Sequence, residues 1–317
     1  MDHALSRRAA LMLFAVVVFA WGLNWSVTKV IVQSVTPLWT TTIRSAVATV
    51  ALAVLLAARR QLILPPRRDM PVVVAIAMLH MVAFSALVAF GLQFVPAGRS
   101  AVLGYTTPLW VVPGAWLFLR EPMSRMRLAG VGLGLAGIAV MFNPLAFDWS
   151  DHKAFIGSGL ILLAALFWAA NILYVRSHKW IATPFQLTFW QTLLATFVLG
   201  AMALAVDGPP HIEWTPRLVA GFLYGGIIGT VLAYWAMATV NRSLPAVTTS
   251  LGILATPVVG LANSAIAFGE PITASLVCAM AMILGGIAIG TLPAGSGRAD
   301  RKSDAPALGK AGEVMAE

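Results

Sequence analysis

The stretch 96–122 occurs a second time at 245–271, and this duplication limits how the chain can fold. In both copies a Pro-Ala pair opens an apolar run, a Thr-Pro pair interrupts it and a Glu-Pro pair closes it, each 149 residues from its counterpart. Upstream, further matches stand 147 residues apart, namely Trp21 with Trp168, Asn24 with Asn171, and Lys29 with Arg176. We therefore interpret the chain as two copies of one unit of about 145 residues.

The composition is that of an integral membrane protein. Hydrophobic residues make up 59% of the chain and charged residues only 10%, whereas about a quarter of the residues in soluble domains are charged. The formal net charge is +9, but the basic residues lie in short clusters between apolar runs, which argues against binding to nucleic acid. The single cysteine, Cys278, excludes an internal disulfide and a multi-cysteine metal site, and we expect no cofactor.

Ten apolar runs are long enough to cross a bilayer as helices. They span residues 9–33, 38–58, 71–93, 97–118, 125–143, 157–177, 184–206, 216–240, 246–268 and 272–292. We therefore expect an all-α membrane protein of ten transmembrane helices, with one five-helix repeat at 9–145 and another at 146–292. A leader of residues 1–8 precedes them, and the polar residues 293–317 are expected to form a disordered cytoplasmic tail.

Lysine and arginine residues indicate the orientation in the membrane. Sixteen of them fall in the leader, the tail and alternate connections, whereas the opposite connections contain only Arg99, Lys153 and Arg217. This bias places both termini in the cytoplasm. Because each repeat has an odd number of spans, the second repeat enters from the opposite face, and we expect the two repeats to be inverted.

Ten spans in two halves, with the Pro-Ala, Thr-Pro and Glu-Pro pairs at matching places, resemble the EamA-type drug/metabolite transporters. The resemblance covers residues 9–292. Within that family the length and the Trp-rich spans are most similar to YddG-type bacterial exporters of aromatic and other neutral amino acids. The resemblance implies a transporter rather than an enzyme, with a small-molecule substrate, surrounding membrane lipid and no requirement for an oligomer.

Two prolines stand at matching places inside expected spans of the two repeats. A proline in mid-helix removes a backbone hydrogen bond, so Pro108 and Pro257 are expected to interrupt the fourth and ninth spans. Gly104 and Gly252 lie one turn earlier and permit close approach of another helix or a substrate. These four residues indicate either flexible, cavity-lining helices that gate transport or fixed structural kinks.

Charged residues are rare within the spans, where each costs about 2.5–3.5 kcal/mol. Lys29 and Arg44 lie toward the outer ends of the first and second spans, where they either meet a substrate carboxylate or extend to the membrane surface. His80 is the one histidine within a span and is either a packing residue or part of the binding site. All twelve acidic residues lie outside the spans, and Glu121 and Glu270 are expected to cap helices.

Two pairs of aromatic and amide side chains occupy matched positions in the repeats. Trp21 stands three residues before Asn24, and Trp168 three residues before Asn171, a spacing that places each pair on one helix face. We expect these pairs to line a central cavity, the alternative being hydrogen bonds between helices. Further substrate-binding candidates are Tyr105, Tyr174 and Gln191, with Trp190, Gln93, Tyr224, Tyr234 and Asn263 behind them.

A sparsely charged pocket with aromatic rings and amides suits a neutral zwitterion or an aromatic molecule. We therefore expect an alternating-access exporter of aromatic and other neutral amino acids. Because no carboxylate lies within the spans, transport is expected to be facilitative. The alternative is an exporter of amphiphilic or cationic drugs, or of other metabolites, coupled to protons through His80.

Other functional classes find less support in the sequence. An intramembrane aspartyl protease or metalloprotease needs buried aspartates or a His-Glu-x-x-His helix, and neither occurs. Ser85 near His80 is a serine–histidine pair on adjacent turns, without an evident oxyanion loop. A channel is more often a symmetric oligomer lined by polar rings. The sequence therefore favours a carrier.

Overall fold

The computed structural model describes residues 5–142 and 150–291, a part of the chain in which every regular element is a helix. The first repeat contains α1 (Arg7–Val32), α2 (Pro37–Ala58), α3 (Met70–Ala75), η1 (Ile76–Phe84), α4 (Ser85–Phe94), α5 (Ala97–Gly104), α6 (Thr107–Leu119) and α7 (Arg125–Met141). The second contains α8 (His152–Ser177), α9 (Pro184–Val206), α10 (Pro216–Leu223), η2 (Tyr224–Leu232), α11 (Ala233–Ser243), α12 (Ala246–Gly252), α13 (Ala255–Phe268) and α14 (Ala274–Thr291). The predicted tail, 293–317, lies outside the described residues, as do residues 1–4 and 143–149.

Local sequence signals set where several helices begin. Proline occupies the first turn of α2, α9 and α10, where its missing N–H group costs nothing. At α9, Thr183 accepts from the backbone of Gln186 and the Gln186 side chain accepts in return, which satisfies N–H groups that the helix leaves free. Ser6 and Thr215 cap α1 and α10 through their hydroxyl groups, which accept from the backbone N–H groups of Ala9 and Leu218.

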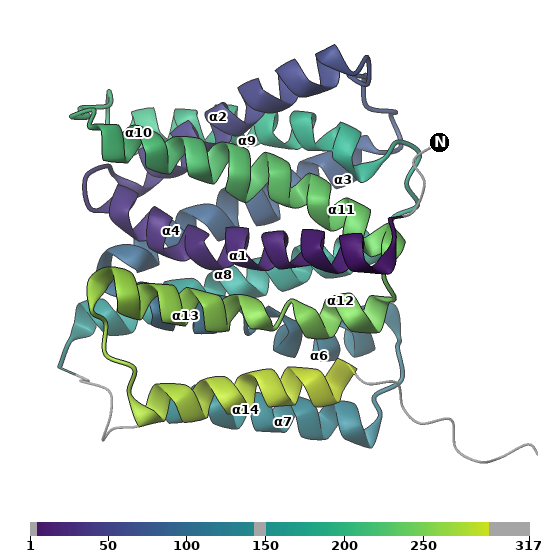
Figure 1. Cartoon of the computed structure of the whole chain (residues 1–317), viewed down its shortest axis with the longest axis vertical. Helices are drawn as coiled ribbons and strands as arrows, with labels where there is room; N and C mark the ends of the chain where they lie inside the picture. Colours follow the sequence, from purple (N-terminus) through teal and green to yellow (C-terminus); the bar gives the residue numbers. More distant parts are fainter. Residues whose placement is uncertain (1–4, 143–149, 292–317) are drawn as a thin grey trace, which may run out of the picture.

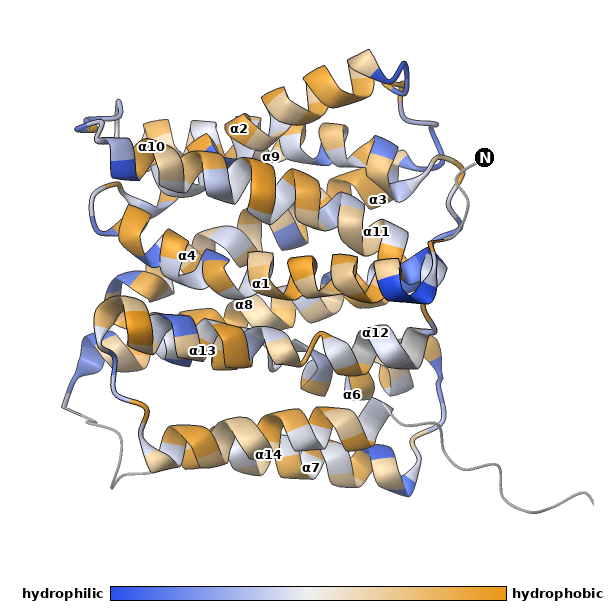
Figure 2. Cartoon of the chain, in the orientation of Figure 1, coloured by the Kyte–Doolittle hydropathy of each residue, from blue (hydrophilic) through white to orange (hydrophobic). Residues whose placement is uncertain are grey.

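Within the described residues, eight helical stretches are long and apolar enough to cross a membrane. η1 joins α3 to α4 and η2 joins α10 to α11, so residues 70–94 and 216–243 each form one continuous stretch. α7 has 17 residues and α13 has 14, which makes both shorter than these eight. Apolar residues cover the helix lengths and hydrophilic residues gather at the ends of the bundle (Figure 2), as expected of a multi-pass membrane protein.

Both spans are interrupted beside their prolines. α5 ends at Gly104 and α6 begins at Thr107, and α12 ends at Gly252, three residues before α13 begins at Ala255. The Thr107 hydroxyl donates to the Gly104 carbonyl at 2.9 Å and approaches the Ala165 carbonyl at 3.3 Å, so the break in the first repeat is satisfied by the adjacent threonine.

A ring from α1 fills the space beside each break. A Cβ atom at Gly104 would lie 2.4 Å from the Trp25 ring, and one at Gly252 would lie 2.2 Å from the Phe14 ring. Neither position therefore has room for a side chain. Both glycines contact α1, which therefore packs against a broken helix of each repeat.

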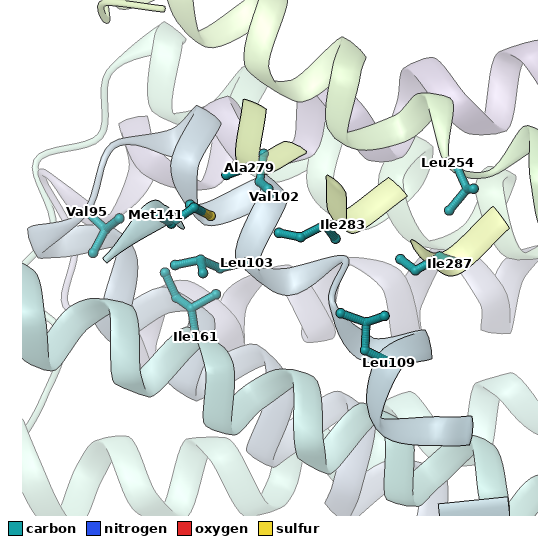
Figure 3. Packing of buried hydrophobic residues seen from close by; sticks show 10 residues of the cluster. All are labelled: Val95, Val102, Leu103, Leu109, Met141, Ile161, Leu254, Ala279, Ile283 and Ile287. Carbon is teal, nitrogen blue, oxygen red and sulfur yellow. The ribbon is translucent and has the colours of Figure 1, made fainter. Parts of the chain in front are cut away.

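α7 and α14 form a separate pair along one edge of the bundle (Figure 1). Their backbones touch, since a Cβ atom at Gly130 would lie 2.5 Å from the Gly286 carbonyl oxygen. This is the close packing that small residues permit between membrane helices. Figure 3 shows Ile283 and Ile287 of α14 among buried residues of α5, α6 and α8, which join the pair to the rest of the molecule.

α2 and α9, the second spans of the two repeats, lie side by side and run in opposite directions. The Trp39 indole, near the start of α2, donates to the Gly208 carbonyl just beyond the end of α9 at 3.0 Å. The Trp190 indole, near the start of α9, donates at 2.7 Å to a carbonyl in the connection after α2. Between them, the hydroxyl oxygens of Thr49 and Thr196, 147 residues apart, are 3.3 Å from each other.

Candidate functional site

Seven rings from both repeats meet in the centre of the described helices, and we call them the aromatic cluster. They are Trp21 and Trp25 on α1, His80 and Phe84 on η1, Tyr105 after α5, Trp168 on α8 and Tyr234 on α11. Neighbouring ring centres are 5.1–6.4 Å apart. The rings thus form a continuous chain of contacts across the interface between the repeats.

His80 lies at the middle of this cluster. Its ring stacks on Phe84 at 5.1 Å, tilts against Trp168 at 5.3 Å, and its Nε2 atom is 2.6 Å from the Tyr234 hydroxyl. Its Nδ1 atom is buried and has no hydrogen-bond partner within the described residues. His80 therefore links the two repeats through Tyr234.

The element that carries His80 is π-helical, and so is its counterpart in the second repeat. η1 and η2 each have nine residues, and they continue directly into α4 and α11. π-helical turns are rare and frequently occur at functional sites, because the wider turn changes the direction of the side chains that follow. In η2 the wide turn holds Gly225 and Gly229 beside the cluster.

Arg44, on α2, lies beside the cluster. Its Nη2 atom donates at 2.9 Å to the hydroxyl of Ser85, which directly follows Phe84 of the cluster along the chain. Among the described residues, no acidic side chain lies within ion-pair distance of Arg44. An arginine within a membrane span thus has a positive charge without a protein carboxylate to balance it.

Trp21 and Asn24, on the same face of α1, both approach η2. The Trp21 indole donates to the Gly229 carbonyl at 3.1 Å. The Asn24 Oδ1 atom is buried without a hydrogen-bond partner in the described structure, and a Cβ atom at Gly229 would come within 2.9 Å of it. A Cβ atom at Gly225 would lie 3.1 Å from the Arg44 side chain and 3.6 Å from Asn24 Oδ1. Glycine in η2 therefore lets the amide and the guanidinium lie on adjoining sides of one backbone turn.

The second matched pair, Trp168 and Asn171, also combines a ring of the cluster with a buried amide. Trp168 contacts His80, Phe84 and Tyr105 within the cluster. Asn171, three residues further along α8, is buried, and its Oδ1 atom also has no partner among the described residues. The structure thus brings Trp21 and Trp168 into one ring cluster.

Three predicted substrate-binding residues lie apart from the cluster. Lys29 donates to the carbonyls of Leu92 and Val95, at 2.5 and 3.0 Å, where α4 ends. Tyr174 is 41% exposed on the outer face of α8. Gln191 is buried on α9, which packs against α2 and η1.

The structure does not form a catalytic pair from Ser85 and His80. The Ser85 hydroxyl accepts from Arg44 and approaches the His80 backbone carbonyl at 3.5 Å, whereas the His80 ring pairs with Tyr234. The serine considered as a nucleophile thus positions an arginine.

Sequence reasoning missed Trp25, Phe84 and the glycines of η2. Trp25 stands four residues after Trp21 and Phe84 four residues after His80, so a helix-face argument from either known residue would have found them. The sequence Tyr-Gly-Gly at 224–226 was the available signal for a close approach in η2.

A buried carboxylate lies outside the spans, at the start of α3. Asp69 accepts from the backbone N–H groups of Ile181 and Ala182, and its Oδ1 atom is 2.9 Å from His178 Nε2. Burial acts to raise the pKa of Asp69, but these hydrogen bonds outweigh it and hold the pKa below its usual value. Asp69 thereby fixes the connection before α3 to the connection after α8.

Comparison with known proteins gives one family over both halves. A model of the EamA-like transporter family matches residues 8–143 and 155–292. The chain is 25% identical to the uncharacterized transporter YoaV of Bacillus subtilis, over 87% of this chain and 94% of that protein. It is 27% identical to a probable amino-acid metabolite efflux pump of Salmonella typhimurium (86% and 91% of the two chains), and 33% identical to a riboflavin transporter of Rhizobium johnstonii (46% and 45%). A crystal structure with 18% identity has the same fold, at a TM-score of 0.62 over 90% of this chain and 97% of that one.

Proposed function

Because the chain belongs to the EamA-like transporter family, we propose that it is an alternating-access exporter of aromatic and other neutral amino acids, or of closely related metabolites. It resides in a bacterial inner membrane with both termini in the cytoplasm, in keeping with the distribution of Lys and Arg along the chain. It acts as a carrier without a cofactor, and a monomer contains the whole site.

The carrier mechanism needs two inverted repeats around one site. Ten crossings result when α7 and the broken pair α12 and α13 are added to the eight long stretches. The antiparallel contact of α2 with α9, and the pairing of Thr49 with Thr196, support a pseudo-two-fold axis in the membrane plane. α1 begins, and α14 ends, at the same end of the bundle in Figure 1, as an even number of crossings requires.

The charge of Arg44, which has no described carboxylate partner beside the aromatic cluster, is the observation that most directly supports an amino acid as substrate. A carboxylate bound there would satisfy the guanidinium, and hydrogen bonds to charged groups are worth about 1.5–3 kcal/mol. The nearby Asn24 Oδ1 atom, an acceptor without a partner in the described structure, suits the ammonium group of the same zwitterion. The rings of Trp21, Trp168 and Tyr105 suit an apolar or aromatic side chain.

Transport is facilitative in this proposal. All acidic residues lie outside the predicted spans, so the site lacks the carboxylate that usually binds a coupling proton. The drug-exporter alternative, with His80 as the proton-binding group, predicts instead a flux that depends on a pH gradient.

Flux into proteoliposomes tests the proposal. We expect saturable uptake of labelled Phe, Trp, Met and Leu that a pH gradient changes little. Arg44→Gln should reduce this uptake by roughly tenfold or more, whereas Arg242→Gln, at the end of α11, should leave it near the wild-type rate. Riboflavin and an organic cation complete the panel, because one relative is named a riboflavin transporter. Uptake of either one without any neutral amino acid, or equal uptake by Arg44→Gln and wild type, contradicts the proposed substrate class.

A further inference from the structure

The start of α5 is capped by a carboxylate from the other repeat. Glu270, in the connection between α13 and α14, accepts from the backbone N–H groups of Ala97 and Gly98, at 2.9 and 3.2 Å. The Ser264 hydroxyl of α13 accepts from the N–H group of Gly98 at 2.9 Å and donates to Glu270. We call this group of contacts the α5 cap. The predicted capping role of Glu270 is thus realised on a helix of the opposite repeat, rather than on its own α14.

A cation from α1 completes the same end of the bundle. Lys29 donates to the carbonyls of Leu92 and Val95, which end α4 directly before the start of α5 that Glu270 caps. Glu270 and Lys29 thus hold four segments together. These are the end of α4, the start of α5, α1 and the connection before α14. Each contact is charge-assisted and therefore stronger than a neutral hydrogen bond.

The matching residues form a corresponding pair at the other end of the bundle. Glu121 stands 149 residues before Glu270, and Arg176 stands 147 residues after Lys29. Glu121 pairs with Arg176 at 3.4 Å and with Arg127 at 3.1 Å. Each end therefore has a carboxylate of one repeat and a cation of the other, which form an ion pair at the Glu121 end and bind neighbouring backbone segments at the Glu270 end. α6 ends beside Glu121, whereas α5, which precedes it in the same span, begins beside Glu270.

α5 is closely packed where it begins. It packs against α13, α8 and α1, and a Cβ atom at Gly98 would lie 2.7 Å from Leu261 of α13. The cap therefore lies over a helix start that is in direct contact with the other repeat.

We propose that Glu270 is a positioning residue of the transport cycle, whose cap on α5, together with Lys29, closes the outer end of the bundle and releases when that end opens. The Glu121 and Arg176 pair has the corresponding role at the inner end. This inference rests on the proposed alternating access. It also explains why α5 is a short helix that ends at the Gly104 break, because a short helix can separate from α13 while α6 stays in place.

Side-specific labelling of a thiol in α5 tests the inference. Ser100 is fully buried in the first turns of α5, and Ser100→Cys changes one atom. The natural thiol is removed by Cys278→Ser. In this background we compare Glu270→Gln with the matched change Glu121→Gln, using a membrane-impermeant maleimide on right-side-out vesicles. Glutamine retains one acceptor and the shape of the side chain, so the fold is preserved while the charge is lost.

We expect Glu270→Gln to raise the labelling rate at position 100 by about tenfold, since it weakens charge-assisted hydrogen bonds that exist only in the closed state. Glu121→Gln should leave that rate unchanged or lower it. Equal labelling in Glu270→Gln and its parent would overturn the inference, and so would an equal rise in both variants, which indicates general loosening. The labelling needs no substrate, so its outcome is separate from that of the flux assay.

Discussion

Gly104→Ala is the substitution whose cost follows most directly from the structure. A Cβ atom at this position would lie 2.4 Å from Cη2 and 2.7 Å from Cζ2 of Trp25. Trp25 is only 7% exposed, and its ring centre is 6.4 Å from that of Tyr105. The indole therefore cannot yield without displacing other rings of the aromatic cluster.

The expected change in the free energy of unfolding of Gly104→Ala combines two opposing contributions. Overpacking of a filled site costs about 1–3 kcal/mol, and the preference of a helix for alanine over glycine offsets about 0.5–1 kcal/mol of it. Taking the middle of each range, about 2 and about 0.75 kcal/mol, a net loss of about 1 kcal/mol in the free energy of unfolding follows. Gly132→Ala, on α7, is the matched control, because a Cβ atom there meets nothing within 4 Å.

Thermal unfolding of the purified proteins in one detergent measures the difference. We expect the Tm of Gly104→Ala to fall by a few degrees and that of Gly132→Ala to stay level or rise. The flux of Gly104→Ala should fall as well, because Trp25 and Tyr105 move together. A Tm at or above that of the wild type for Gly104→Ala would refute the packing of Trp25 against α5.

Three further changes test other parts of the structure. Thr107→Val removes the hydroxyl that satisfies the Gly104 carbonyl and should lower stability by about 1–3 kcal/mol in chemical unfolding. Thr239→Val should cost less, because the Thr239 hydroxyl donates to the Trp235 carbonyl one turn earlier in the unbroken helix α11. Asp69→Asn should lower the Tm at neutral pH. Because the folded-state pKa of Asp69 is held below its unfolded value, its contribution is present above about pH 4 and is lost as pH falls through the folded pKa, so a Tm series over pH 3–7 should be flatter in the variant. Trp168→Ala should reduce flux severalfold in proteoliposomes, while Trp214→Ala, 57% exposed outside the cluster, should not.

The sequence predicted the broad fold because its signals are local or periodic. Apolar runs marked the helices, and Pro108 and Pro257 marked both breaks. The π-helical turn of η1 was not predicted, since residues 76–84 contain neither Gly nor Pro and hydrophobic periodicity does not report a change of one residue per turn. That turn depends on packing against other helices.

The candidate site was predicted in part, for reasons of helix geometry. Trp168 and Asn171 are three residues apart and share a face of α8, whereas Tyr174 is six residues from Trp168 and therefore about 240° around the helix. This rotation explains its exposure. Lys29 stands on the same helix as Trp21 but about two turns further along, where it meets the end of α4 instead of the cluster. The partners of Arg44 and Glu270 come from distant segments, which a sequence without contacts does not reveal.

Counterflow in proteoliposomes tests the central claim most directly, namely that one site between two repeats is exposed to each side in turn. Vesicles loaded with unlabelled leucine or phenylalanine are diluted into a trace of the labelled amino acid, with no ion gradient. The account predicts transient accumulation of label, faster than in empty vesicles and lost in Arg44→Gln. Uptake that does not saturate and is indifferent to the internal amino acid would contradict it, because such a flux indicates an open pore rather than a carrier.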